Sequence, residues 1–384
     1  MSMWMVDAFF WLVLPIAALE AARIIRLELK QERRTLGAAF AFGGAELVAL
    51  CLCAATASPL FLAGVTAARV VLYYLREGNL GGRRPLKSAL IAAGLLLLAW
   101  AGPIESFAQI VHVDIAPVWR HAILGLIGLT CVLTTLPVRI ADEPKETLVA
   151  PLSLIAFARV ILPLGSFEPE FVIVVPVVAA GMSLICALWL LSAGARANQF
   201  EPSTLVSEIL ICERGVILSF VWMGLASGID LAEVGALFQW WAGALALLAL
   251  EASLRRRPLP KPMAFFALAM TVSLPGTIGF VAEDLLAQGL LELRPYVAAA
   301  FMGVTAINAA ALYLALVNII VDLHAGETPF GSAPREASPS LMMLTTAALA
   351  LAIGLAPSPF VDLATRAHTA VVHHPTPASH AAHG

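Results

Sequence analysis

The sequence predicts an all-α protein, a polytopic transmembrane helix bundle of about twelve spans with one helix broken near Pro275 and Gly276. Three observations predict this fold class. Of the 384 residues, 60% are hydrophobic and only 13% are charged, about half the charged fraction of a typical soluble domain. Apolar runs long enough to cross a bilayer recur along the whole chain. Basic residues gather in every second loop between these runs.

The apolar runs define the expected spans. They lie at 5–22, 36–56, 58–75, 88–103, 119–137, 148–165, 171–193, 207–228, 231–251, 263–281, 296–322 and 340–357. Most of the loop Lys and Arg residues follow the odd-numbered runs, as in 23–34, 76–87 and 255–261. By the positive-inside rule these loops are cytoplasmic and both termini lie outside. We therefore expect a multi-pass protein of the inner (cytoplasmic) membrane of a bacterium.

The domain organisation follows from the same runs. We expect residues 1–364 to form a single transmembrane domain. Residues 365–384 carry five of the eight histidines among Pro, Ala and Ser, a composition typical of a flexible tail. The five cysteines lie in apolar runs without metal-ligand spacing, so they are expected to be packing residues and no metal site is predicted. The net charge of −3 argues against a nucleic-acid partner.

Charged residues inside the first spans are candidate functional residues, because an ionisable group in the membrane is costly. Glu46 and Arg69 lie mid-span in neighbouring runs and can pair if their depths match. Such a pair would either fix helix packing or act as a stop on a proton path. Arg159 lies in an otherwise apolar run. Its guanidinium requires a carboxylate or water beside it.

A second group of charges lies in the run 207–228 and at the start of the next. Glu213 and Arg214 are the deepest, Glu208 lies nearer the end of the run, and Glu233 opens the following helix. A buried carboxylate beside a cation is suited to load and release protons. The alternative is a helix-packing salt bridge with a capping acid, and the sequence leaves both open.

The stretch Ser273–Glu283 interrupts a hydrophobic span. Pro275 and Gly276 should break the helix there, which exposes backbone groups that lipid cannot satisfy. Such a break is tolerated where it is buried in protein or lines a wet path. The nearby carboxylate of Glu283 points to ion or proton movement. Asn308, a polar residue in a later span, is a candidate contact of the broken helix.

The segment Leu274–Glu283, with the sequence Leu-Pro-Gly-Thr-Ile-Gly-Phe-Val-Ala-Glu, resembles the broken late helix of the antiporter-like proton-translocating subunits. These subunits belong to respiratory complex I, to Mrp-type cation/proton antiporters and to energy-converting hydrogenases. The resemblance extends over about residues 265–365, where Tyr313, His324–Glu327 and Gly354–Pro357 keep the same order. It implies a divergent and shortened relative.

A second resemblance covers about residues 180–257. Ile211–Gly215 and Gly228–Gly235 resemble a small membrane subunit of hydrogenase-4-type complexes, which is related to the K-type subunit of complex I. Two membrane glutamates carry protons in that family, and Glu213 and Glu233 match them. The family has Asn at the position of Arg214 and Asp near the position of Gln239.

These resemblances imply a membrane subunit of a complex I-like multi-subunit assembly that conducts or couples protons, or alternatively sodium ions. The implied proton path runs through Glu213, Glu233, Glu283, Glu46 and Glu208. The residues Arg214, Arg159 and Arg69 would tune these acids. No catalytic centre is evident in this chain. Other membrane and peripheral subunits, as in an NADH-quinone oxidoreductase or a hydrogenase, would hold iron–sulfur, flavin or nickel–iron cofactors.

Two alternatives stay open. The chain could be a non-conducting scaffold subunit of such a complex, which the absence of a lysine inside the spans favours, since the family's usual proton switch is a membrane lysine. It could also be the membrane partner of a proton-driven inorganic-carbon uptake complex, because those complexes use related subunits. Lipids are expected around the chain in every case.

Overall fold

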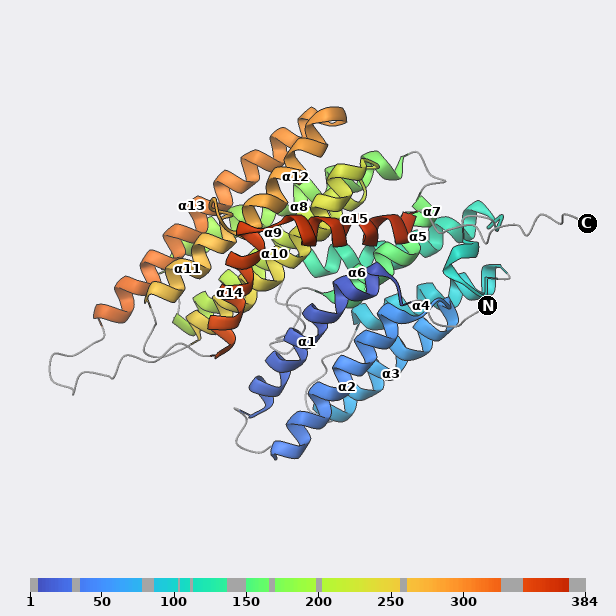
Figure 1. The fold of residues 1–384 in the computed structure, drawn as a ribbon, viewed down its shortest axis with the longest axis horizontal. Helices are drawn as coiled ribbons and strands as arrows, with labels where there is room; N and C mark the ends of the chain where they lie inside the picture. Colours follow the sequence, from blue (N-terminus) through green and yellow to red (C-terminus); the bar gives the residue numbers. More distant parts are fainter. Residues whose placement is uncertain are drawn as a thin grey trace, which may run out of the picture. The chain divides into compact units, whose positions relative to one another are not determined.

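The computed structural model describes residues 6–29, 35–77, 86–102, 104–110, 113–136, 150–165, 170–197, 202–255, 261–325 and 341–372. The regular elements within these ranges are all helices, which confirms the all-α class (Figure 1). The helices form two compact units. The chain leaves the first unit near the end of α5, returns to it for the segment 151–169, and returns again at Asp362.

The first unit holds the N-terminal helices. Asp7 caps α1, because its Oδ1 accepts the amide of Phe10 at 3.0 Å, and Thr35 caps α2 through the amide of Ala38. Contacts link α1 to α2, α2 to α3, α3 to α4, and α6 to both α1 and α2. Its elements are α1 Ala8–Leu29, α2 Leu36–Ala55, α3 Pro59–Glu77, α4 Leu86–Ala101, η1 Phe107–Gln109, most of α5 Pro117–Thr135, α6 Pro151–Ala156, the π-helical turn η2 Phe157–Ile161, α7 Leu162–Gly165 and most of α15 Ser358–Val372.

The second unit is built around α10. This helix contacts α9, α11, α12 and α14, and 94% of its 18-residue apolar window is buried. A helix that is apolar on all sides is expected at the centre of a bundle. The elements of this unit are α8 Phe171–Ala195, α9 Pro202–Leu225, α10 Asp230–Leu254, α11 Lys261–Thr271, α12 Ile278–Leu293, α13 Pro295–Ala325 and α14 Leu341–Leu355.

The expected number of about twelve spans is not confirmed. Among the described residues, six helices are long and apolar enough to cross a membrane, or seven if Met343–Leu355 and Ser358–Val371 form one bent span. Four more apolar helices, in α3, α4, α6 to α7 and α11, are shorter. The break between α11 and α12 and the π-helical turn at Phe157–Ile161 shorten some apolar helices, whereas the charges of α9 make it less apolar without interrupting its 24 residues.

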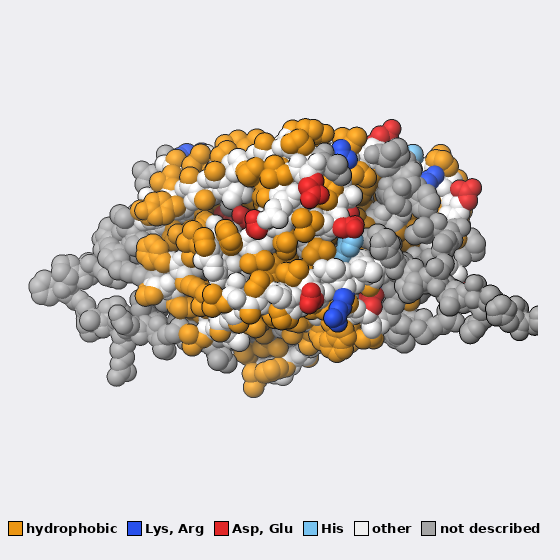
Figure 2. All heavy atoms as spheres, turned by 45° about the horizontal axis from the view of Figure 1, so that its top comes forward, with side chains coloured by type: hydrophobic (Ala, Val, Ile, Leu, Met, Phe, Trp, Pro, Cys, Tyr) orange, Lys and Arg blue, Asp and Glu red, His pale blue; other side chains and the backbone are white. Residues whose placement is uncertain are grey.

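The outer face of α8 shows why the protein spans a membrane. Eight large apolar side chains of α8 are exposed, namely Ile173, Val174, Val177, Val178, Leu184, Ile185, Leu188 and Trp189. Hydrophobic side chains also outnumber charged ones on the described part of the face seen in Figure 2. Exposed apolar surface of this extent is unfavourable in water. Together with the long apolar helices, it identifies a multi-pass membrane protein.

The predicted helix break is confirmed. α11 ends at Thr271 and α12 begins at Ile278. Gly276 has φ +89°, a left-handed conformation that glycine adopts without steric cost. Local turns satisfy part of the freed backbone, since the amide of Thr277 donates to the carbonyl of Leu274 at 3.1 Å. The break is therefore an ordered structure that protein groups stabilise, as the low polarity of a membrane requires.

The C-terminal helix α15 runs across the boundary expected at residue 364. It begins at Ser358 and ends at Val372, so the first residues of the expected tail are helical. The remaining tail residues, 373–384, lie outside the described residues.

Candidate functional site

Glu213 is a fully buried carboxylate at the middle of α9. Asn308 on α13 donates its Nδ2 hydrogen to Glu213 Oε2 at 3.1 Å. The other carboxylate oxygen, Oε1, is buried and has no hydrogen-bond partner among the described residues. An ionisable group in this setting keeps one oxygen open to a proton or to water.

Glu283 lies on α12, within two turns of the helix break. Ser273 donates its hydroxyl hydrogen to Glu283 Oε1 at 2.7 Å. Ser273 itself has φ +55°, a left-handed conformation that is uncommon and costly for a residue with a Cβ. The break therefore has a direct connection to the acid, because the strained residue at the break supplies the carboxylate's hydrogen bond.

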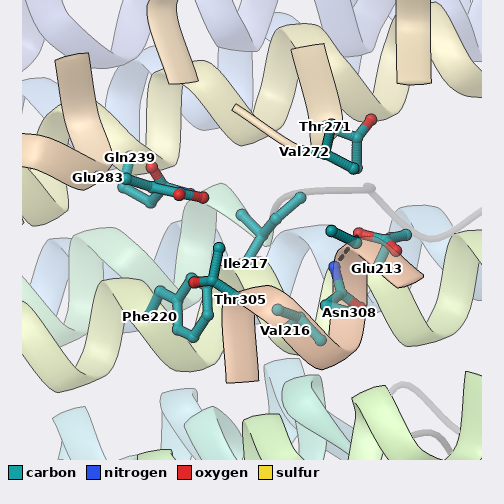
Figure 3. A pocket seen from close by; sticks show the side chains of 11 residues that line it. Glu213, Val216, Ile217, Phe220, Gln239, Thr271, Val272, Glu283, Thr305 and Asn308 are labelled. Carbon is teal, nitrogen blue, oxygen red and sulfur yellow. Dashed lines mark hydrogen bonds between the residues drawn. The ribbon is translucent and has the colours of Figure 1, made fainter. Parts of the chain in front are cut away.

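A small cavity brings both carboxylates together with polar groups from five helices (Figure 3). It offers about 10 Å³ to the centre of a water molecule, which is space for about one water. In Figure 3, Glu283 and Gln239 lie at one end, and Glu213 and Asn308 at the other. The lining residues are Glu213, Val216, Ile217, Phe220, Gln239, Thr271, Val272, Glu283, Thr305, Asn308 and Ala309.

The cavity has an excess of hydrogen-bond acceptors. Besides Glu213 Oε1, the side-chain oxygens of Gln239 and Asn308 are buried without a partner among the described residues. An unsatisfied buried acceptor costs about 1–3 kcal/mol. A water, or a proton on the carboxylate, provides the missing donors. The cavity is thus suited to hold an exchangeable proton.

Both carboxylates receive hydrogen bonds from neutral groups. Asn308 and Ser273 are uncharged donors, and within the described part of the chain neither Glu213 nor Glu283 forms an ion pair. A carboxyl group in a neutral setting can change its charge without leaving a cation unpaired, in contrast to a buried salt bridge. The site can therefore accept a proton and release it again.

The other acids predicted near this region lie apart from the cavity lining. Glu208 on α9 accepts the indole hydrogen of Trp189 at 3.1 Å. Glu233 is buried in the first turn of α10, where a negative charge is favourable at a helix N-terminus. Arg214 follows Glu213 on α9 but does not line the cavity, because successive helical residues point about 100° apart.

The charges predicted in the first unit are found in ion pairs. The predicted pair of Glu46 and Arg69 is confirmed, with two hydrogen bonds, one of them from Nε to Oε2 at 3.2 Å. Arg159 is fully buried in the π-helical turn, and its Nη2 lies 2.8 Å from Asp7 Oδ2. Its guanidinium also faces the ring of Phe9, 4.9 Å from the ring centroid.

Several residues of these sites were not predicted from the sequence. Asp7 lies inside the first apolar run and just before α1, and only the fold reveals it as the partner of Arg159. Ser273 lies within the break between α11 and α12, and its residue type gives no signal of its contact with Glu283. Asn308 was expected near the broken helix, and it lines the same cavity while bonding to Glu213. Gln239, a lone polar residue in an apolar run, lies with the predicted Glu283 at the opposite end of the cavity.

Comparison with solved structures shows the fold. The chain is similar to a chain of the Mrp complex from Dietzia sp. DQ12-45-1b, with a TM-score of 0.67 and 15% identity over 96% of this chain and 84% of that one. It is also similar to a chain of the membrane-bound sulfane sulfur reductase, an archaeal respiratory membrane complex, with a TM-score of 0.70 and 15% identity over 95% and 82%.

A third similar structure is a chain of respiratory complex I from Thermus thermophilus with bound NADH, with a TM-score of 0.64 and 19% identity over 94% of this chain and 83% of that one. No protein-family model and no curated protein matches the sequence. At these identities the likeness concerns the fold. The chain therefore shares its fold with chains of these three membrane complexes.

Proposed function

We propose that this chain is a membrane subunit of a complex I-like multi-subunit assembly and that it moves protons through Glu213 and Glu283. The observation that carries the proposal is the cavity between these residues. Two carboxylates with neutral hydrogen-bond donors line it, beside a broken helix and with buried oxygens that lack donors. Carboxylates inside a membrane domain are typical of proton paths.

The setting of the proposal comes from the fold. The similar chains belong to an Mrp complex, to a sulfane sulfur reductase complex and to respiratory complex I. By that likeness we propose that other membrane and peripheral subunits associate with this chain, and that redox cofactors and the source of energy reside in them. We place the chain in the bacterial cytoplasmic membrane with both termini outside, because of its loop charges.

A proton fits the cavity better than a sodium ion. The space suffices for about one water, whereas a metal cation that leaves water needs a shell of several oxygen ligands. A proton needs only a file of hydrogen-bonded groups. Glu233 and Glu208 lie on α10 and α9 towards the two ends of these helices, and we propose them as outer stations of the same path.

The test uses the intact assembly, purified through an affinity tag on this chain and identified by its co-purifying subunits. The complex is reconstituted into liposomes that contain a pH-sensitive dye, and a potassium diffusion potential drives proton entry. We expect Glu213→Gln to lower the proton flux about tenfold or more, because the amide cannot take up and release a proton. Flux that does not depend on sodium supports the proton as the coupling ion.

Glu251→Gln is the matched control. Glu251 is a buried acid on α10, but it pairs with Arg255 at 3.1 Å and does not line the cavity. We expect this variant to keep the wild-type flux. If Glu213→Gln conducts as well as the wild type while its subunit composition is unchanged, the proton path through Glu213 is refuted and the scaffold function is favoured.

A further inference from the structure

We propose that Ile217 is a hydrophobic gate that separates Glu213 from Glu283, so that protons pass between the two carboxylates only when α9 and α10 move apart at this residue. The inference rests on the proposed proton path and adds the residue that controls it. It follows from the register of three helices around the cavity and from the packing of one side chain.

The first step is the register of α9 against α10. These helices are joined by the short segment 226–229 and contact each other. Gly224 approaches Ala236. Seven residues earlier on α9 and seven residues later on α10, Ile217 touches Gly243. The two helices are thus antiparallel and in constant register. Gln239 lies one turn from Ile217 in one direction, and Glu213 lies one turn away in the other.

The second step places Glu283 in the same frame. α12 packs closely against α10. A Cβ added to Gly235 would lie 2.7 Å from the amide nitrogen of Leu286, and a Cβ added to Gly289 would meet Ala232. Because one residue number rises by three as the other falls by three, these helices are also antiparallel. The same register brings Glu283 level with Gln239, in agreement with their shared end of the cavity in Figure 3.

The third step is the gap between the carboxylates. The Cα of Glu213 and the level of the Cα atoms of Gln239 and Glu283 are separated by about two helical turns, roughly 12 Å along the helix axis, and the side chains extend from there into one cavity. Within the described residues each carboxylate bonds to another partner, Asn308 or Ser273, and not to the other carboxylate, so water is needed to connect them. The cavity has space for about one water molecule. Figure 3 shows the Ile217 side chain between the two polar ends.

The fourth step is the fit of the gate residue. Ile217 is 4% exposed, and its Cγ2 occupies the space that a Cβ of Gly243 would fill. A β-branched side chain in a helix has one strongly preferred rotamer, so Ile217 cannot swing aside on its own. Opening requires the α9 and α10 backbones to separate. An apolar constriction of this kind blocks conduction by excluding water.

The experiment compares two side chains of the same shape at position 217. Ile217→Val keeps the constriction apolar. Threonine has nearly the same volume as valine, but Ile217→Thr adds a hydroxyl that holds water. In the reconstituted assembly we expect Ile217→Thr to raise the potential-driven proton flux about tenfold, a change of about 1.4 kcal/mol in the barrier. Ile217→Val should stay within about twofold of the wild type.

A second pair of variants tests whether the space between Ile217 and Gly243 is the place where the path is closed. Ile217→Ala removes the side chain beyond Cβ and should also raise the flux. Adding Gly243→Ala to that variant returns a methyl group to the same space from the facing helix, so the flux should fall again. If the two substitutions merely damaged the bundle, their effects would accumulate, and the proton flux of the double variant would depart further from wild type than that of either single variant. Thermal unfolding and subunit composition are measured for every variant.

The outcomes for these variants distinguish a failure of the gate from a failure of the proposed proton path. Equal flux in Ile217→Thr and Ile217→Val, with Glu213→Gln still impaired, overturns the gate and leaves the path intact. A raised flux in Ile217→Thr that survives the addition of Glu213→Gln refutes both, because that leak bypasses Glu213. Loss of the raised flux on adding Glu213→Gln is the expected result.

Discussion

The two compact units of this protein hold their buried charges in different ways. In the first unit, Arg69 pairs with Glu46, and Arg159 pairs with Asp7. In the second unit, the carboxylates of Glu213 and Glu283 receive hydrogen bonds from neutral groups, Asn308 and Ser273. The second unit also holds a countercharged acid, Glu251 with Arg255, so acids of one residue type lie beside a cation at some positions and beside neutral donors at Glu213 and Glu283.

This difference separates structural from functional charge. A buried ion pair is strongly destabilised when one partner changes its charge, because the other is left uncompensated. A carboxyl group beside an amide or a hydroxyl can be hydrogen-bonded in both protonation states. We therefore expect the paired charges, such as those of Arg69 and Arg159, to be fixed elements of packing, whereas those of Glu213 and Glu283 can vary during turnover.

The largest expected effect on stability is that of Arg159→Met. The substitution keeps much of the side-chain volume but leaves Asp7 without its cation and removes the contact with Phe9. We expect the free energy of unfolding to fall by about 3–5 kcal/mol, measured by denaturant titration in mixed micelles. Asp7→Asn combined with Arg159→Met should recover part of this loss, since Asn still caps α1. No recovery would mean that the charge pair is not the cause.

Glu46→Gln should have the next largest effect. It removes the carboxylate that pairs with Arg69, at a depth where the two side chains are 13% and 18% exposed, so partial solvent access reduces the cost to about 2 kcal/mol. The double variant Glu46→Gln with Arg69→Gln should be more stable than the single variant. If Glu46→Gln instead lowers proton flux with no loss of stability, then this pair belongs to the proton path and the contrast between the units fails.

Ser273→Ala removes the hydroxyl that donates to Glu283. We expect a loss of about 1 kcal/mol in unfolding free energy, typical of one hydrogen bond. A few-fold decrease in proton flux should accompany it, because the carboxylate is no longer held at the cavity. Thr277→Ala at the same break serves as a control, since its hydroxyl bonds only to the carbonyl of Leu274. Equal flux changes in both variants would trace the effect to the break rather than to Glu283.

Glu213→Gln should have the smallest effect on stability but a large effect on proton flux. The amide retains an oxygen for the hydrogen bond from Asn308, so we expect unfolding free energy to change by less than about 1 kcal/mol while the proton flux is lost. Thermal unfolding and flux are measured on the same preparation. A loss of stability as large as that of Glu46→Gln would show that Glu213 is also a fixed structural charge.

Part of the site could be predicted because its chemistry is written in single residues. Glu213 is a carboxylate within an apolar run, and Pro275–Gly276 is a Pro-Gly pair within another. Both are recognised from their own segment, whatever the rest of the sequence is. The partner of each could not be predicted in the same way. Asn308 lies 95 residues from Glu213, and Asp7 lies 152 residues from Arg159. Nothing local in the sequence couples such positions.

The sequence by itself determined the helical class, the membrane setting, the broken helix and the acids worth attention, because hydrophobicity, backbone restriction by proline and the cost of buried charge are local properties. Only the tertiary structure decided which acids are countercharged and which share a cavity. Ile217 illustrates the reason, since it is an ordinary apolar residue in its own helix. Its position between two carboxylates arises from the register of α9, α10 and α12, and that register is set by packing across helices.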